Sequence, residues 1–148
     1  MTSSDIETAD QLTRRRARML PFLALIFVTQ QVSYFIEADA RVRMVDHVKV
    51  GAWLLLSVVL LAALATGGFW FKPKAVRALM DDEVTRANRA EAFRIGFLVT
   101  MVAGIGLYFL DQFAPMRGRE AIHILVTIGI ATALLVFGYL ERRALRYG

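Results

Sequence analysis

The chain contains no cysteine among its 148 residues. Disulfide bonds, thiol redox chemistry and cysteine-ligated metal sites are therefore excluded. The sequence also lacks a glycine-rich phosphate-binding loop and any Ser/His/Asp set arranged as in a hydrolase. We therefore predict a protein that is not an enzyme and that carries no cofactor.

Charge is almost absent from four long apolar segments, although Lys, Arg, Asp and Glu make up 21% of the chain. Hydrophobic residues account for 57%, whereas a soluble domain is nearer about 45–50% apolar. Each segment is long enough to cross about 30 Å of hydrocarbon. We therefore predict an all-α, multi-pass membrane protein with an antiparallel four-helix transmembrane bundle. The expected spans are about 19–36, 50–71, 93–110 and 121–140.

Basic residues are distributed unevenly around these spans. The N-terminal arm, residues 1–18, carries four Lys or Arg, the 72–94 region carries six, and the tail, residues 141–148, carries three. The two other loops, 37–49 and 111–120, together carry five. Because cytoplasmic segments are enriched in Lys and Arg, we predict that both termini and the 72–92 loop lie in the cytoplasm of a bacterial inner membrane.

The first span is preceded by a polar arm that we expect to be mobile or to lie on the membrane surface. Its start faintly resembles a twin-arginine signal, with a small-x-small site at 38–40. The apolar run is longer than a usual signal core and contains two glutamines, so we expect a retained span. The basic residues expected at the membrane surface are Arg14, Arg15, Arg16, Arg18, Lys72, Lys74 and Arg77.

The segment Asp81–Leu110 begins highly charged and continues into an apolar run without an early Gly or Pro. We predict one helix, capped by Asp81 or Asp82, that starts in the cytoplasm and ends in the bilayer. Its charged part could dock a soluble partner, or it could be a solvated connector that only sets the topology. The candidate partner-binding residues are Asp82, Glu83, Arg86, Arg89 and Arg94.

The outer half of the first span is unusually polar, with Gln30, Gln31 and Tyr34. Amides within a bilayer face other helices or water, so these residues could form a solute pathway or simply hydrogen-bond between helices. The uncharged runs supply no charged residue within the membrane, although ion-coupled transporters usually need such a residue. A small transporter or channel therefore remains the alternative to a docking protein.

Two histidines, His47 and His123, are expected near the outer membrane face. Glu120 and His123 have the i, i+3 spacing of carboxylate–histidine metal sites, but such sites use two copies of this pair. A bis-histidine haem between the second and fourth spans is another use of such histidines. We predict no metal or haem, and expect interfacial histidines paired with loop acids.

The two outer loops suggest an internal repeat of two helical hairpins, because 34–37 and 108–111 are both Tyr-Phe-aliphatic-acid and an arginine follows six residues after each acid. Small-x-x-x-small patterns within the second and fourth spans offer packing seams. Those seams can be used within one chain, so a homodimer is left open.

Around Asp82-Glu83, Arg86 and the alanines that lead into the third span, the sequence resembles small uncharacterised bacterial four-span inner-membrane proteins. The resemblance covers about residues 72–140. Members of that group are often paired with a helix-turn-helix transcription regulator. The resemblance implies a regulatory membrane protein that holds such a regulator and does not itself contact nucleic acid.

Overall fold

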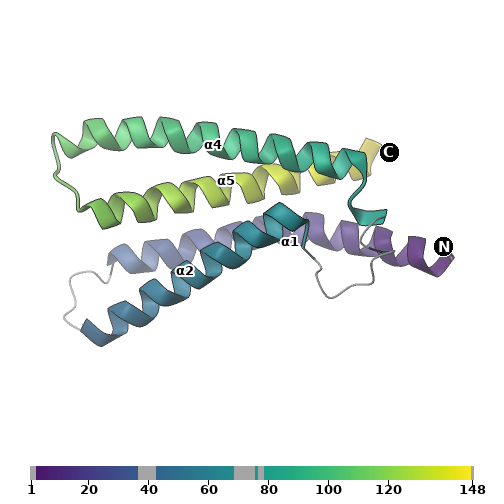
Figure 1. The fold of residues 1–148 in the computed structure, drawn as a ribbon, viewed down its shortest axis with the longest axis horizontal. Helices are drawn as coiled ribbons and strands as arrows, with labels where there is room; N and C mark the ends of the chain where they lie inside the picture. Colours follow the sequence, from purple (N-terminus) through teal and green to yellow (C-terminus); the bar gives the residue numbers. More distant parts are fainter. Residues whose placement is uncertain (1–2, 37–42, 69–75, 77–78, 148) are drawn as a thin grey trace.

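The computed structural model describes the backbone of residues 3–36, 43–68, 76 and 79–147, and the side chains of 6–32, 48–68, 76 and 79–146. Helices and short turns account for all of these residues, so the predicted all-α class is confirmed. The four helices are α1 (Ser3–Ile36), α2 (Arg43–Thr66), α4 (Glu83–Asp111) and α5 (Gly118–Tyr147). They run roughly along one axis as an elongated bundle (Figure 1).

Three helical segments in the described residues are long and apolar enough to cross a membrane, and they lie in α2, α4 and α5. This finding agrees with a membrane protein. The first expected span, residues 19–36, lies within α1, whose described side chains end at Val32.

The central helix of the bundle is α5, against which α1 and α4 both pack over most of their length (Figure 1). Two close approaches explain this arrangement. A Cβ added at Gly138 would lie 3.0 Å from the Pro21 ring of α1, and one added at Gly96 of α4 would lie 3.1 Å from the Gly129 carbonyl oxygen. The glycines therefore let these helices approach α5 closely.

The second helix, α2, packs more lightly, and it meets mainly α5. It leaves the rest of the bundle along part of its length (Figure 1). The hairpin of α4 and α5 is thus tightly packed, whereas α1 packs on α5 far more than on α2. The packing of the two hairpins does not repeat, even though the sequences of their loops are alike.

One helix, α2, ends earlier than the sequence predicted, and another, α4, starts where the sequence predicted. α2 ends at Thr66, before the expected end of its span, because Gly67 and Gly68 take φ of +75° and +74°. Such a φ favours glycine and ends a helix. α4 starts as predicted, since the Asp82 side chain accepts a hydrogen bond from the Thr85 N–H at 2.7 Å.

The N-terminal arm was expected to be mobile or to lie on the membrane surface, but it belongs to α1, which is continuous from Ser3. Ala9 and Leu12 pack against Val76, Leu79 and Met80 in a second small core. This contact holds the start of α1 against the segment that precedes α4. Because the arm is polar overall, its composition did not indicate that two apolar side chains, Ala9 and Leu12, would hold it in place.

Candidate functional site

One end of the bundle is held together by a buried ion pair between α1 and α5. The Arg16 guanidinium donates to the Glu141 carboxylate, and only 6% of Arg16 and 2% of Glu141 is exposed. Removing two charges from water is costly, so such a pair is retained only where further groups satisfy it. The surroundings of Arg16 and Glu141 supply most of these groups, although the Arg16 Nε has no hydrogen-bond partner among the described residues.

Residues of α4 and the residue that follows α2 form further hydrogen bonds with this ion pair. Arg16 also donates to the Thr85 hydroxyl of α4 at 3.3 Å and to the Gly67 carbonyl at the end of α2 at 3.4 Å. The second Glu141 oxygen accepts from the Asn88 amide at 3.3 Å. The Arg16 guanidinium carbon lies 5.4 Å from the centre of the Phe137 ring, within reach of a cation–π interaction.

Two further contacts extend the network. Arg142 donates from Nε to the Ala17 carbonyl of α1 at 3.0 Å. Arg89 of α4 lies 3.1 Å from the Asp81 carboxylate, and a Cβ at Gly67 would lie 3.0 Å from the same guanidinium. We call this part of the molecule the charged end, comprising residues 6–18, 67–68, 76, 79–92 and 141–146. It is an ordered structure with its own buried polar network.

The candidate partner-binding residues have different environments in the structure. Asp82 caps α4, and Arg89 is half-buried beside Asp81. Glu83 and Arg86 are exposed on the first turns of α4. Arg94 is exposed as well, but its neighbours Phe93, Phe97 and Leu98 are exposed apolar residues. Asp82 is exposed too but is used as the cap, so Glu83 and Arg86 are the exposed members of this set at the charged end for which the structure gives no side-chain partner among the described residues.

The candidate membrane-surface residues also separate into groups. Arg16 is buried and paired rather than exposed, as described above. Arg14, Arg15 and Arg18 are exposed, and Arg14 forms an exposed ion pair with Asp10 at 3.1 Å. Lys72, Lys74 and Arg77 lie outside the described residues.

A surface groove of about 410 Å³ lies beside the buried ion pair, between α4 and α5. It is lined by Asn88, Leu140, Arg143 and Ala144. None of these four was a candidate from the sequence. Asn88 could have been suspected, because an amide within a run of charged residues has little reason to be there unless its hydrogen bonds are used.

A second buried polar group lies deeper in the bundle, between α2 and α5. The His123 ring stacks on the Trp53 indole with centroids 3.9 Å apart, and Trp53 donates from Nε1 to the Thr127 hydroxyl at 3.4 Å. Ser57, also buried, donates back to the Trp53 carbonyl. His123 is thus built into the packing between α2 and α5.

The polar residues of the first span fall partly inside this region. Gln31 of α1 is 6% exposed, and neither its amide nitrogen nor its amide oxygen has a hydrogen-bond partner among the described residues. Because Arg16 meets Glu141 and Leu20 approaches Gly138, antiparallel continuation brings Gln31 level with Thr127. Gln30 is half-buried, and the Tyr34 side chain lies outside the described residues.

The weak metal candidates are engaged elsewhere. Glu120 accepts from the Arg117 N–H at 3.3 Å at the start of α5, and His123 faces Trp53. The His47 side chain is not among those described. In the described part of the chain, no three potential ligands gather in a way that could hold a metal ion.

Comparisons with protein-family models, with curated proteins and with solved structures find no match to this chain. A functional conclusion therefore depends on the geometry described above. The charged end has an ordered surface with a groove, and the deeper polar group has a buried amide without a partner. The first arrangement is suited to binding a macromolecule, and the second to hydrogen-bonding a small solute or a neighbouring helix.

Proposed function

We propose that the protein is a regulatory, non-enzymatic, four-span protein of a bacterial inner membrane that docks a soluble partner on its charged end. In this proposal the first span lies in α1, and both termini and the charged end are cytoplasmic. The orientation is supported by the excess of Lys and Arg at this end of the chain. The lipid bilayer is the second partner of the chain.

The observation that carries the proposal is the buried network around Arg16 and Glu141. A connector that only sets topology needs solvated charge and no internal structure. Here a buried ion pair joins the parts of α1 and α5 that extend beyond their apolar runs, and hydrogen bonds of Thr85 and Asn88 attach α4 to that pair. A small apolar core holds the start of α1 to the segment that precedes α4. Such an end presents a fixed surface, which is what recognition by another protein requires.

The proposed docking surface comprises Glu83 and Arg86 on α4 and the groove that Asn88 and Arg143 line. Two exposed apolar side chains at the same end, Ile6 and Val84, add area that a partner could bury. The arginines favour a partner with an acidic surface. A helix-turn-helix regulator is the partner that the sequence resemblance suggests, and it would be held at the membrane without direct contact between this chain and nucleic acid.

Reversing two charges on this surface tests the proposal. We expect the double variant Arg86→Glu, Arg143→Glu to lose the soluble protein that co-purifies with the wild type from native membranes in mild detergent. Each exposed charge that meets an opposite charge contributes up to about 1 kcal/mol, so the two changes should weaken binding by about 30-fold or more once repulsion is added. Mass spectrometry and a binding titration measure the loss.

The matched control is Arg117→Glu, Arg119→Glu, which reverses two exposed arginines at the opposite end of the bundle. The control should bind the partner as the wild type does, and all three proteins should insert and elute alike. If the Arg86/Arg143 variant retains its partner, or if no soluble protein accompanies the wild type, the docking surface is wrongly assigned.

A second candidate function, a solute pathway, is favoured by the buried amide of Gln31. An amide without a partner destabilises a folded protein unless it is used. We expect Gln31→Leu to raise the free energy of unfolding in detergent by about 1–3 kcal/mol, because the substitution removes that cost. Thermal unfolding of the two proteins measures the change.

The same variant separates packing from transport. In proteoliposomes, a solute pathway through the bundle predicts that Gln31→Leu abolishes flux although the protein is more stable. Gln11→Leu, which replaces an exposed glutamine at the charged end, is the control. Flux that is absent from the wild type, or equal in the wild type and Gln31→Leu, would remove the transport candidate.

A further inference from the structure

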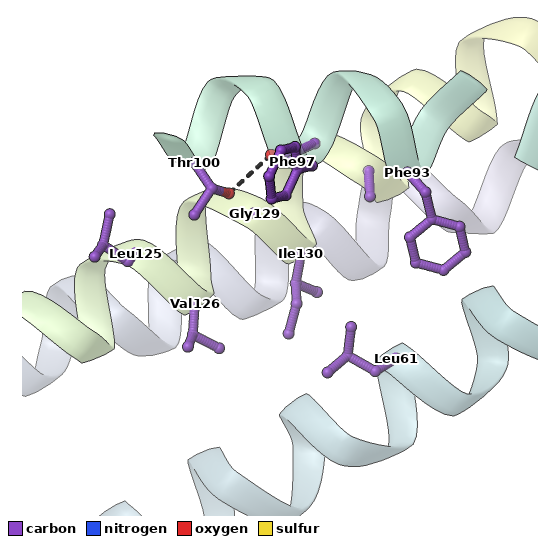
Figure 2. A pocket seen from close by; sticks show the side chains of 10 residues that line it. Leu61, Phe93, Phe97, Thr100, Leu125, Val126, Gly129 and Ile130 are labelled. Atoms are coloured by element: carbon purple, nitrogen blue, oxygen red, sulfur yellow. Dashed lines mark hydrogen bonds between the residues drawn. The ribbon is translucent and has the colours of Figure 1, made fainter. Parts of the chain in front are cut away.

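A narrow apolar groove runs between α2 and α4, with α5 as its floor (Figure 2). Its volume is about 300 Å³. Phe93 and Phe97 form the wall on α4, Leu61 forms the opposite edge on α2, and Val126 and Ile130 lie on the floor. The groove is present because Gly96 and Gly129 allow α4 to pack close to α5, whereas α2 packs on α5 more lightly.

The lining leaves no polar group free for an occupant. Thr100 has the one side-chain hydroxyl in the lining, and it donates to the Gly96 carbonyl of its own helix at 2.8 Å, as Figure 2 shows. All other lining side chains are apolar or absent, as in glycine. An occupant would therefore gain only from contact with hydrocarbon, so it should itself be hydrocarbon.

The cross-section of the groove suits one extended chain better than a whole helix. The lining of α4 extends from Phe93 to Thr100, a rise of about 10 Å at about 1.5 Å per residue. Dividing the volume by that length gives a cross-section of about 30 Å². A helix with its side chains is about 10–12 Å across and needs more than twice that area. A single unbranched chain fits.

A cationic residue adjoins the Phe93 end of the groove along α4, although it does not line the groove itself. Arg94 follows Phe93 directly, and 71% of its side chain is exposed. Its partner in the described residues is Glu91, at 3.4 Å, and this carboxylate is 44% exposed, so the pair contributes little. Arg94 is therefore able to turn its guanidinium to another anion.

The depth of Arg94 indicates which anion. Asn88 meets Glu141 and a Cβ at Gly129 would touch Thr100, so Arg94 lies level with α5 between 129 and 141. That part of α5 is uncharged up to Leu140. An arginine at this level extends toward the headgroups, where it meets lipid phosphate.

From these observations we propose that the groove binds one acyl chain of an anionic phospholipid, whose headgroup phosphate pairs with Arg94. The chain lies along Phe93 and Phe97 and covers the gap between α2 and α4. This assignment withdraws Arg94 from the docking surface for a soluble partner. It does not depend on the docking proposal, because none of the lining residues belongs to that surface.

Native mass spectrometry in detergent tests the site, with phosphatidylglycerol and phosphatidylcholine of identical acyl chains as probes. We expect the wild type to bind phosphatidylglycerol about five-fold more tightly, the effect of one arginine near an anionic headgroup. Leu61→Trp fills the groove, so it should weaken binding of both lipids about ten-fold or more, as expected when two or more methylenes leave it. Arg94→Gln should retain binding but lose the preference.

Val59→Trp is the control, because Val59 and Leu61 lie on the same helix and are each 43% exposed, while only Leu61 lines the groove. It should bind both lipids like the wild type. Equal binding by Leu61→Trp and Val59→Trp, or an unchanged preference in Arg94→Gln, would overturn the proposal. A dimer that Leu61→Trp dissociates without any change in lipid binding would also overturn it, since a second copy would then occupy the groove.

Discussion

Glu141→Ala is expected to lower the free energy of unfolding by about 3–5 kcal/mol. The variant leaves the guanidinium of Arg16 buried without its counter-charge, and it also removes the acceptor of the Asn88 amide. Because three helices meet at this carboxylate, the loss should appear as a lower melting temperature of the whole bundle. Thermal unfolding in detergent, followed by circular dichroism, measures it.

The control is Asp10→Ala, which breaks the ion pair of Asp10 with Arg14. Both of those side chains are more than half exposed, so the loss should be below about 1 kcal/mol. A second variant, Arg16→Met with Glu141→Leu, removes both buried charges and should unfold near the wild-type temperature. A Glu141→Ala protein as stable as Asp10→Ala would show that the buried pair does not hold the charged end together.

Gly96→Leu is expected to be the second most damaging change, because α4 lies so close to α5 at this residue that there is no room for a side chain. A Cβ at Gly96 would lie 3.1 Å from the Gly129 carbonyl oxygen and 3.2 Å from the Ala133 methyl. The first of these atoms is backbone and cannot rotate away. The strain should cost about 1–3 kcal/mol and separate α4 from α5.

Gly106→Leu provides the comparison on the same helix. Nothing lies within 4 Å of a Cβ at Gly106, which is exposed near the far end of α4. This variant should be as stable as the wild type or slightly more stable, since a helical glycine costs about 0.5–1 kcal/mol relative to alanine. Thermal unfolding of both variants, side by side, measures the difference. Equal melting temperatures would mean that the α4–α5 contact is looser than the structure indicates.

Hydrophobic segments alone were sufficient to predict most of the fold. Uncharged runs of this length predict helices in a membrane, and α2, α4 and α5 agree with that prediction. The long helix from charged to apolar sequence was also predicted from local patterns, as was its cap by one of two aspartates, of which the structure uses Asp82. Local patterns failed where the contact was remote, as in the start of α1, which is fixed by residues near Met80.

The buried ion pair could not be predicted from composition, because four arginines in the arm look alike. The face of the helix on which each arginine lies, its helical phase, distinguishes Arg16 from the other three. Arg16 lies on the same face of α1 as the buried side chains that follow it at spacings of three or four, and Glu141 lies likewise on α5. The buried series are Arg16, Leu20, Ala24, Phe27 and Gln31 on α1, and His123, Thr127, Ile130, Leu134, Phe137 and Glu141 on α5.

Phase identifies the face but not the partner. It would have marked Arg16, Gln31, His123 and Glu141 as polar residues on buried faces, and the structure then brings Arg16 to Glu141 and His123 to Trp53. The lipid groove was beyond sequence reasoning for another reason. The groove forms because α2 packs on α5 less closely than α4 does. No residue pattern along α2 or α4 predicts this gap.

The distance of 125 residues between Arg16 and Glu141 also sets an order of events during synthesis. At about 5–20 residues per second, the ribosome needs about 6–25 s to reach Glu141 after it has made Arg16. During that time the first helix has an arginine on its inner face and no carboxylate to receive it. In the proposed topology, where α1 crosses the membrane, the guanidinium stays among water and headgroups during that time. On this proposal α1 takes its final place only when the last helix arrives.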